Sequence, residues 1–363
     1  MQTAPGAGLP AENLGVLRVR RRVMNPYSYV GAMTTSRLGR DGSYNVAYGL
    51  DGTLRLFGDD YLAFAWAQTF DDDQETGSIF DAAQFRAHWE RRTQVGLGYD
   101  LSLTQAGAAY TPGLGFQLRR DYTRLGDRLF YGWMPGEGSR LFQHEVSLYG
   151  RVFLRNAGGT VESAAVGPGW SGQTRIGADF DVRLLRRTER LQEAFALAEG
   201  VSVPAGDYAF YQVEGTYGTT SSRRWSATAE TVAGSFYDGR RFALGVVPAW
   251  SLSRYLDLSG AYRFERVAFP ERDRRFNVHV ARLRVEASLN TELSGAAFIQ
   301  YNSAGDAVIA NVRLRYNPRE GNDLYLVYNH GLNTDRHRRM PTLPITGRQT
   351  VLVKYTHTLN FGI

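Results

Sequence analysis

The chain has 363 residues, no cysteine and a formal net charge of +6. The lack of cysteine excludes disulfides, thiol nucleophiles and zinc–thiolate sites. No apolar run approaches the roughly 18 residues of a transmembrane helix. Basic and acidic residues are interleaved, without a basic tail or recognition helix, so no nucleic-acid partner is expected.

Residues 1–13 are rich in Ala, Gly and Pro. They lack the charged segment followed by an apolar stretch that marks a signal peptide. We predict a flexible N-terminal segment over 1–13, followed by a single domain that covers 14–361.

From Leu14 onward, apolar and polar residues alternate in one segment after another, as in Ala281 to Asn290. The period of two predicts about nineteen strands, from 14–23 to 349–361. Most have about 10–13 residues, which suits a tilted strand that crosses a bilayer and exceeds the usual length in soluble proteins. We therefore predict an all-β fold, a transmembrane antiparallel up-and-down β-barrel with about 18–20 strands in this chain and one short helical turn near 188–198.

The connections between these strands alternate in length. Short ones, such as 171–173 and 290–292, alternate with a set that contains the long segments 106–123, 187–206 and 331–348. Bacterial barrels have short periplasmic turns and longer outer loops, and an even number of strands. The pattern places the start of the first strand outside. Either an odd number of strands precedes Leu14 or the strand count is wrong by one. We favour the first interpretation, with about 22 strands in the complete barrel.

The last predicted strand carries alternating apolar residues and ends in an aromatic residue. Tyr355, Leu359 and Phe361 lie on the same face of this strand. The pattern resembles the C-terminal signal by which outer-membrane barrels are recognised for assembly. From these three residues we predict that the chain binds the barrel-assembly machinery and that it lies in outer-membrane lipid.

Charged and amide residues occupy alternate positions in many strands. Such side chains are unfavourable where they face lipid and acceptable where they face a water-filled lumen. They have two interpretations: a basic stripe that attracts anionic solutes, or an internal network of salt bridges with acidic residues of the lumen. The predicted lumen-lining residues are Arg18, Arg20, Arg22, Asp179, Asp181, Arg183, Arg263, Arg282, Arg284, Gln300, Asn302, Arg313 and Arg315.

The connection 110–121 combines a tight path, set by Pro112 and its glycine neighbours, with the charges of Arg119, Arg120 and Asp121. It has two interpretations. The segment could fold inward as a constriction or plug, or it could be an outer loop with ordinary turn chemistry.

Nothing in the sequence predicts catalysis. The six histidines form no spaced metal pair and no nucleophile motif occurs, so we expect no catalytic residue, no metal and no cofactor. His330 or His337 near Asp335 leaves a hydrolase at the outer rim as a remote alternative.

Several stretches resemble a known family: 14–21, 110–121, 200–208, 234–240 and 300–303. The chain is similar over nearly its whole length to an uncharacterised outer-membrane β-barrel domain that usually follows a family-nine-like carbohydrate-binding domain in Gram-negative bacteria. The resemblance implies the outer membrane, a barrel and a link to glycans. It also implies that a signal peptide, the binding domain and the first strands precede this segment. The family has no established catalytic residues.

Together these observations predict a pore, or a component for transport or surface handling, with a polar lumen lined by Arg and Asp. The expected solute is a carbohydrate or a small anion. The alternative is a plugged structural barrel that anchors a carbohydrate-binding domain.

Overall fold

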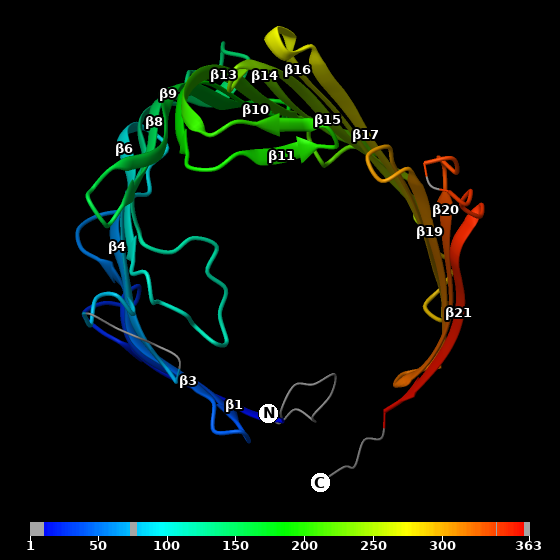
Figure 1. Ribbon diagram of the computed structural model, residues 1–363, viewed down its shortest axis with the longest axis horizontal. Helices are drawn as coiled ribbons and strands as arrows, with labels where there is room; N and C mark the ends of the chain where they lie inside the picture. Colours follow the sequence, from blue (N-terminus) through cyan, green and yellow to red (C-terminus); the bar gives the residue numbers. More distant parts are fainter. Residues whose placement is uncertain (1–10, 73–77, 339, 359–363) are drawn as a thin grey trace. The chain divides into compact units, whose positions relative to one another are not determined.

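The computed structural model describes residues 11–72, 78–338 and 340–358. Over these residues the chain is built from β-strands, with one short 3-10 helix, η1 (Pro270–Arg272) (Figure 1). No helix in the described part of the chain has the length and apolar character needed to span a membrane. Nineteen strands belong to a hydrogen-bonded sheet, and β11 and β12 form a separate two-stranded ribbon.

The strands of the described chain follow one another with few intervening residues. They are β1 (Glu12–Arg22), β2 (Tyr29–Gly39), β3 (Tyr44–Arg55), β4 (Asp60–Asp71), β5 (Ala83–Arg91), β6 (Gly96–Ala106), β7 (Tyr122–Trp133), β8 (Leu141–Arg155), β9 (Val161–Thr174), β10 (Asp179–Leu191), β11 (Phe195–Ala198), β12 (Val201–Val203), β13 (Gly206–Gly218), β14 (Trp225–Phe236), β15 (Gly239–Ser253), β16 (Leu256–Phe269), β17 (Arg274–Ser288), β18 (Leu293–Asn302), β19 (Ala307–Arg319), β20 (Asn322–Asn333) and β21 (Thr346–His357).

The chain divides into two compact units, which are described separately. The first unit contains the described residues up to Trp170, together with Leu184–Phe195 and Pro204–Phe210. In it, β1 to β8 are antiparallel neighbours in sequence order.

The second unit contains Ser171–Arg183, Ala196–Val203 and the described residues from Tyr211 onward. Its strands from β13 to β21 are likewise antiparallel neighbours in sequence order. Both units therefore have the up-and-down topology that the alternation of polar and apolar residues predicts.

The connections separate the ends of the strands into two kinds. The end reached by 107–121 and 334–345 is called the loop end, and the end with short turns such as 254–255 and 320–321 is called the turn end. The long connections lie at the loop end, as predicted, but the connections 237–238, 270–273 and 303–306 at the loop end of the second unit are as short as those at its turn end, so the predicted alternation holds only in part.

Turn chemistry explains where individual strands stop. In the turn after β2, the Ser43 hydroxyl and backbone N–H both donate to the Asp41 carboxylate, at 2.7 and 3.1 Å. The hydroxyl bond is the main reason that the pKa of Asp41 lies below its ordinary value. Gly42 follows with φ of +93°, a conformation that glycine adopts without steric cost.

Most predicted strands agree with the structure, and three details are wrong. The turn predicted at 171–173 is strand, because β9 continues to Thr174 and the chain reverses at 175–178, where Gly177 has φ of +82°. The helical turn predicted near 188–198 is absent from that segment, since β10 extends to Leu191 and β11 follows. The first strand, β1, begins at Glu12, two residues before its predicted start.

The structure describes only one of the three residues of the predicted assembly signal. Tyr355 lies in β21 opposite Leu324 of β20, with its side chain 65% exposed. Leu359 and Phe361 lie outside the described residues. Recognition by the barrel-assembly machinery therefore stays a prediction, as does the missing N-terminal part.

Candidate functional site

The register of the second unit brings the predicted lumen residues of β16 to β19 onto one face of the sheet. Residues paired across neighbouring strands point to the same side. Arg284 pairs with Ser259 of β16 and with Phe298 of β18. Arg282 pairs with Gln300, and Ser294 pairs with Arg315.

The same face continues toward β10. Arg263 pairs with Gly245 of β15, which pairs with Glu230 of β14. At the end of β13, a Cβ placed on Gly218 would meet the carboxylate of Asp179 at 2.6 Å, so Asp179 shares this side. We call it the second polar face. It carries Asp179, Asp181, Arg183, Arg263, Arg282, Arg284, Gln300, Asn302, Arg313 and Arg315.

Several charges of the second polar face are neutralised by partners on the same face. The ion pairs are Asp181–Arg183 at 2.9 Å, Arg263–Glu265 at 3.9 Å, Arg284–Glu286 at 2.8 Å and Arg315–Asp323 at 2.6 Å. For these residues the structure favours the salt-bridge interpretation, since each charge has an acidic or basic neighbour.

Arg282 and Arg313 differ from these pairs. Both side chains are exposed, and within the described part of the chain neither has a hydrogen bond or an ion pair. Beside Arg313 lies a depression of about 350 Å³, which Glu286, Arg315 and Tyr325 also line. Ala296 forms part of its floor, so a small side chain leaves the space open. This depression offers both signs of charge and one aromatic ring to a solute.

The first unit has a corresponding charged side, which we call the first polar face. Arg18 of β1 forms an ion pair with Asp51 of β3 at 2.8 Å. The guanidinium of Arg20 lies 3.8 Å from the centre of the Tyr29 ring. Arg22 is exposed at the end of β1. Of these three predicted lumen residues, Arg18 and Arg20 therefore help to hold β1 against β2 and β3.

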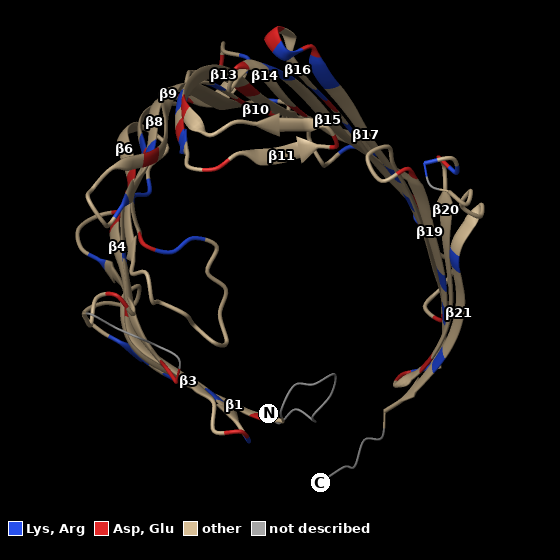
Figure 2. Ribbon diagram, viewed as in Figure 1, with Lys and Arg blue, Asp and Glu red and all other residues tan. Residues whose placement is uncertain are grey.

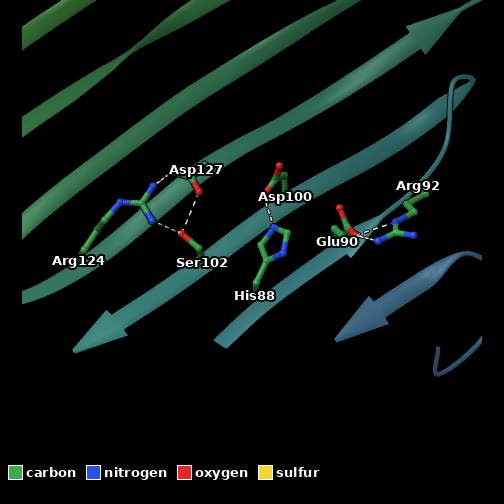
Figure 3. Close-up of polar contacts among 7 residues, drawn as sticks. All are labelled: His88, Glu90, Arg92, Asp100, Ser102, Arg124 and Asp127. Carbon is green, nitrogen blue, oxygen red and sulfur yellow. Dashed lines mark hydrogen bonds and ion pairs between the residues drawn. The ribbon is translucent and has the colours of Figure 1, made fainter. Parts of the chain in front are cut away.

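A denser polar cluster spans β5, β6 and β7 on the first unit (Figure 3). His88 and Asp100 are 2.6 Å apart, and Ser102 donates to Asp127 at 2.8 Å. Arg124 donates to Ser102 at 2.7 Å and also bonds Asp127. Charged groups thus bridge adjacent strands and satisfy one another, as buried or half-buried charges require.

The segment 107–121 turns inward on the side of the first polar face, and its first half is bonded to that face (Figure 1). Asn45 of β3 donates to the carbonyl of Thr111 at 2.7 Å and accepts from the N–H of Gly113 at 2.7 Å. The N–H of Thr111 donates to the hydroxyl of the fully buried Thr69 at 3.3 Å. A Cβ on Gly113 would lie 2.6 Å from Asn45 Oδ1, so glycine permits this close approach.

Two further contacts fix the rest of this segment. Gln84 of β5 donates to Gln117 at 3.2 Å. Arg119 lies 3.4 Å from Glu162 and stacks over the Phe153 ring at 4.3 Å. Arg120 remains exposed, and Asp121 ends the segment with φ of +55°. The inward interpretation of 110–121 therefore agrees with the hydrogen bonds, which reach from β3 to β9 across the first polar face.

The start of this segment carries a buried aromatic ring. Tyr110 is 7% exposed, and its burial raises the pKa of its phenol above the ordinary value. The phenol is therefore neutral where it is buried. No local pattern distinguishes Tyr110 from the other tyrosines among the 21 of the chain.

The second unit carries its own inward segment, the ribbon of β11 and β12. Val201 and Val203 are 6% and 0% exposed. At the loop end of the second polar face, Val267 and Phe269 are equally buried, and Arg272 donates to the carbonyl of Ser202. The ribbon therefore covers a small apolar patch on the otherwise polar side of β15 and β16.

The opposite face of each unit is apolar and exposed. In the second unit, Leu283 is 48% exposed, Ile299 46% and Leu314 47%. Aromatic side chains flank this aliphatic band. The turn-end row is Tyr217, Trp225, Trp250, Tyr316 and Tyr355, and the loop-end row is Phe242, Tyr262, Phe264, Tyr301 and Tyr328.

The band between these rows has about the length of a strand that crosses a bilayer. Phe242 and Trp250 stand eight residues apart on β15, or about 26 Å along the strand, close to the roughly 9–11 residues of a tilted transmembrane strand. In the first unit, Leu50 is 54% exposed, Leu97 57% and Leu148 54%, on the side opposite the first polar face. Each unit therefore separates a charged side from an apolar side.

The candidate catalytic residues do not form a site. His88 bonds Asp100, but Ser102 bonds Asp127 and Arg124. His330 contacts the Thr346 hydroxyl at 3.2 Å, and the contact of His337 with Asp335 is through its backbone N–H. Among the described residues, no group of three or more His, Asp or Glu side chains could hold a metal ion.

Comparisons with known proteins add little to this description. No family model and no curated protein matches the chain. Among solved structures, it is similar to the anion-selective porin from Comamonas acidovorans, with 12% identity, a TM-score of 0.37 and 95% of each chain covered. A likeness at this level decides nothing about function, so any functional conclusion depends on the strand register and the two faces.

Proposed function

We propose that the chain is the β-barrel of a Gram-negative outer-membrane pore. Its polar faces would line a water-filled lumen and its apolar faces would contact lipid. The observation that carries the proposal is the separation of faces in each unit, with an exposed aliphatic band flanked by aromatic rows. Outer-membrane barrels have this outer surface, an apolar band about 25 Å high between aromatic girdles.

A soluble sheet fits these faces poorly. Side chains such as Leu97 and Leu283 are about half exposed, and many large apolar neighbours share their sides. Contiguous apolar surface of this extent is unfavourable in water at about 25 cal/mol per Å². Contact with lipid removes that cost without requiring a second sheet to cover the band.

The charges of the second polar face support an anionic or sugar-like solute. Arg282 and Arg313 carry fixed positive charge without an acidic partner, which raises the local concentration of anions in a narrow aqueous space. In the depression beside Arg313, Tyr325 offers an aromatic ring, and Glu286 and Arg315 offer polar groups. A small carbohydrate or its acidic degradation product has the matching chemistry, in line with the glycan link that the family resemblance implies.

A specific observation favours a second candidate, a plugged barrel that only anchors a binding domain. The segment 107–121 and the ribbon of β11 and β12 both cover parts of the polar faces. If these segments fill the lumen, the charges behind them serve stability alone. The pore proposal treats 107–121 as a constriction that narrows the passage.

Conductance in planar bilayers separates the two functions. We expect stepwise single-channel currents, and in a KCl gradient a reversal potential with the sign of anion selectivity. Heat-dependent gel mobility shows whether the protein is folded. If the folded protein never conducts, even after residues 112–118 are shortened, the pore is refuted and the anchor is favoured. An enzyme at the rim is not proposed, since no described residues assemble a site for one.

A further inference from the structure

Three arginines stand on the apolar face of the second unit, where charge is unexpected. Arg240 and Arg275 flank Ala268 in one row of paired residues. Arg266 stands in the next row, between Phe242 and Asn277. At a strand spacing of about 4.8 Å, Arg240 and Arg275 are about 10 Å apart at their Cα atoms, with Arg266 between them.

These arginines belong to the loop end of the sheet. Figure 2 shows the basic stretch at the start of β17, directly after the acidic turn of η1. Phe264 and His279 form the next row on this face, on the turn-end side of Arg266, and the aliphatic band follows them. On β15 and β16 the order is therefore arginine, aromatic ring and aliphatic side chain, which matches the order of headgroup, interface and acyl chain in a membrane leaflet.

The three arginines have no partner among the residues that the structure describes. All three are exposed, and within the described residues none makes a hydrogen bond, an ion pair or a ring contact. On the opposite side of β15 and β16, Arg241 pairs with Glu265 at 2.9 Å. At the loop end, the face that the proposed function turns toward lipid thus carries a cluster of three arginines without partners among the described residues.

Three like charges at this spacing repel one another, and a charge at a lipid-facing position is costly unless an anion compensates it. The guanidinium group presents a planar fork that binds phosphate oxygens with two parallel hydrogen bonds. Charge complementarity therefore points to a ligand that is both an anion and a lipid, because the apolar band lies directly beside the guanidinium groups.

We propose that Arg240, Arg266 and Arg275 form a docking site for a phosphorylated lipid of the leaflet at the loop end. The phosphate would lie on the three guanidinium groups, and the acyl chains would lie along Phe242, Phe264 and the aliphatic band. The proposal rests on the membrane position given by the proposed function, and it adds a specific lipid contact that a pore does not require.

The test uses the full chain purified in detergent and native mass spectrometry with dioleoyl phosphatidic acid as the probe. We expect the wild type to retain phosphatidic acid and not dioleoyl phosphatidylcholine. The variant Arg240→Gln/Arg266→Gln/Arg275→Gln should bind phosphatidic acid at least about tenfold more weakly, because charge-assisted hydrogen bonds are lost. The single variant Arg266→Gln, whose fold is least perturbed, should give an intermediate loss.

The matched control is Arg282→Gln/Arg313→Gln, which removes two unpaired arginines from the second polar face and should retain phosphatidic acid fully. Equal retention by the triple variant and the wild type would overturn the site. Displacement of the lipid by millimolar inorganic phosphate would overturn the lipid assignment and leave a site for free phosphate.

Channel recordings on the same proteins separate this proposal from the proposed function. A triple variant that conducts like the wild type but loses the lipid supports the site. A wild type that binds the lipid at these arginines and never conducts refutes the pore and leaves the lipid site standing.

Discussion

The two polar faces use their charges differently. On the first, Arg18, Arg124 and Arg128 bond Asp51, Asp127 and Glu145, and the segment 107–121 is tied down over the loop end. On the second, Arg282 and Arg313 stand free of partners among the described residues, and Arg313 lines an open depression. The contrast indicates that the first face holds strands and loop in place, whereas the second leaves charge available to a solute.

The largest expected effect comes from releasing the segment 107–121. Replacing Asn45 by Ala removes its bonds to Thr111, Gly113 and Asp71. Two of these bonds hold the segment, so at about 1 kcal/mol for each net hydrogen bond its docking should weaken by about 2 kcal/mol. If the segment constricts a pore, single-channel conductance should rise about twofold or more and become noisier.

The control for this variant is Asn290→Ala at the turn end, where the side chain accepts from the backbone N–H groups of Glu292 and Leu293. It removes the same side chain without touching the segment, so its conductance should stay at the wild-type value. Unchanged conductance in both variants would mean that 107–121 does not limit the passage.

The next effect concerns selectivity. Replacing both Arg282 and Arg313 by Ala removes two uncompensated positive charges from the second polar face. The ratio of anion to cation permeability, measured from the reversal potential in a KCl gradient, should fall by about twofold or more. The triple substitution of Arg240, Arg266 and Arg275 removes more charge from the other side of the sheet and should leave this ratio unchanged.

A fall of equal size in that triple variant would show that net charge, rather than the face of the sheet, sets the selectivity. The contrast between the two faces would then lose its functional meaning.

The smallest effect is expected on the first polar face. Arg124→Ala leaves Ser102 and Asp127 without their guanidinium partner. Because the site is partly exposed, we expect a loss of about 1 kcal/mol in the free energy of unfolding, measured in urea by gel mobility, and little change in selectivity. A selectivity change as large as that of the Arg282 and Arg313 variant would contradict the division of roles.

The strands could be predicted because alternation of polar and apolar residues is a local signal. It located β18 and most other strands within a few residues. It misplaced the turn between β9 and β10, because Ser171, Gly172 and Gln173 have the composition of a turn while the strand continues to Thr174. It also predicted a helical turn where Leu191 ends a strand, since charged residues interleaved with leucines fit both periods.

The site could be predicted only as a set of residues on alternate positions. Which arginines pair depends on register between strands, so the difference between Arg315, paired with Asp323, and the unpaired Arg313 needed the structure. The contacts of Asn45 with 107–121 join residues 66 and 68 positions apart. The arginines at 240 and 266 could have been noticed, because they share the parity of apolar positions in their own strands.

The most direct test of a barrel with one polar and one apolar face is a cysteine scan along β17. Because the chain contains no cysteine, the wild type serves as the unlabelled control. Single cysteines replace residues 281–286 in turn, and intact proteoliposomes are treated with a membrane-impermeant maleimide. We predict labelling at 282, 284 and 286, and at least about tenfold slower labelling at 281, 283 and 285, where the side chains would face lipid. Uniform labelling at all six positions, or labelling of the apolar set alone, would contradict the assignment of the faces.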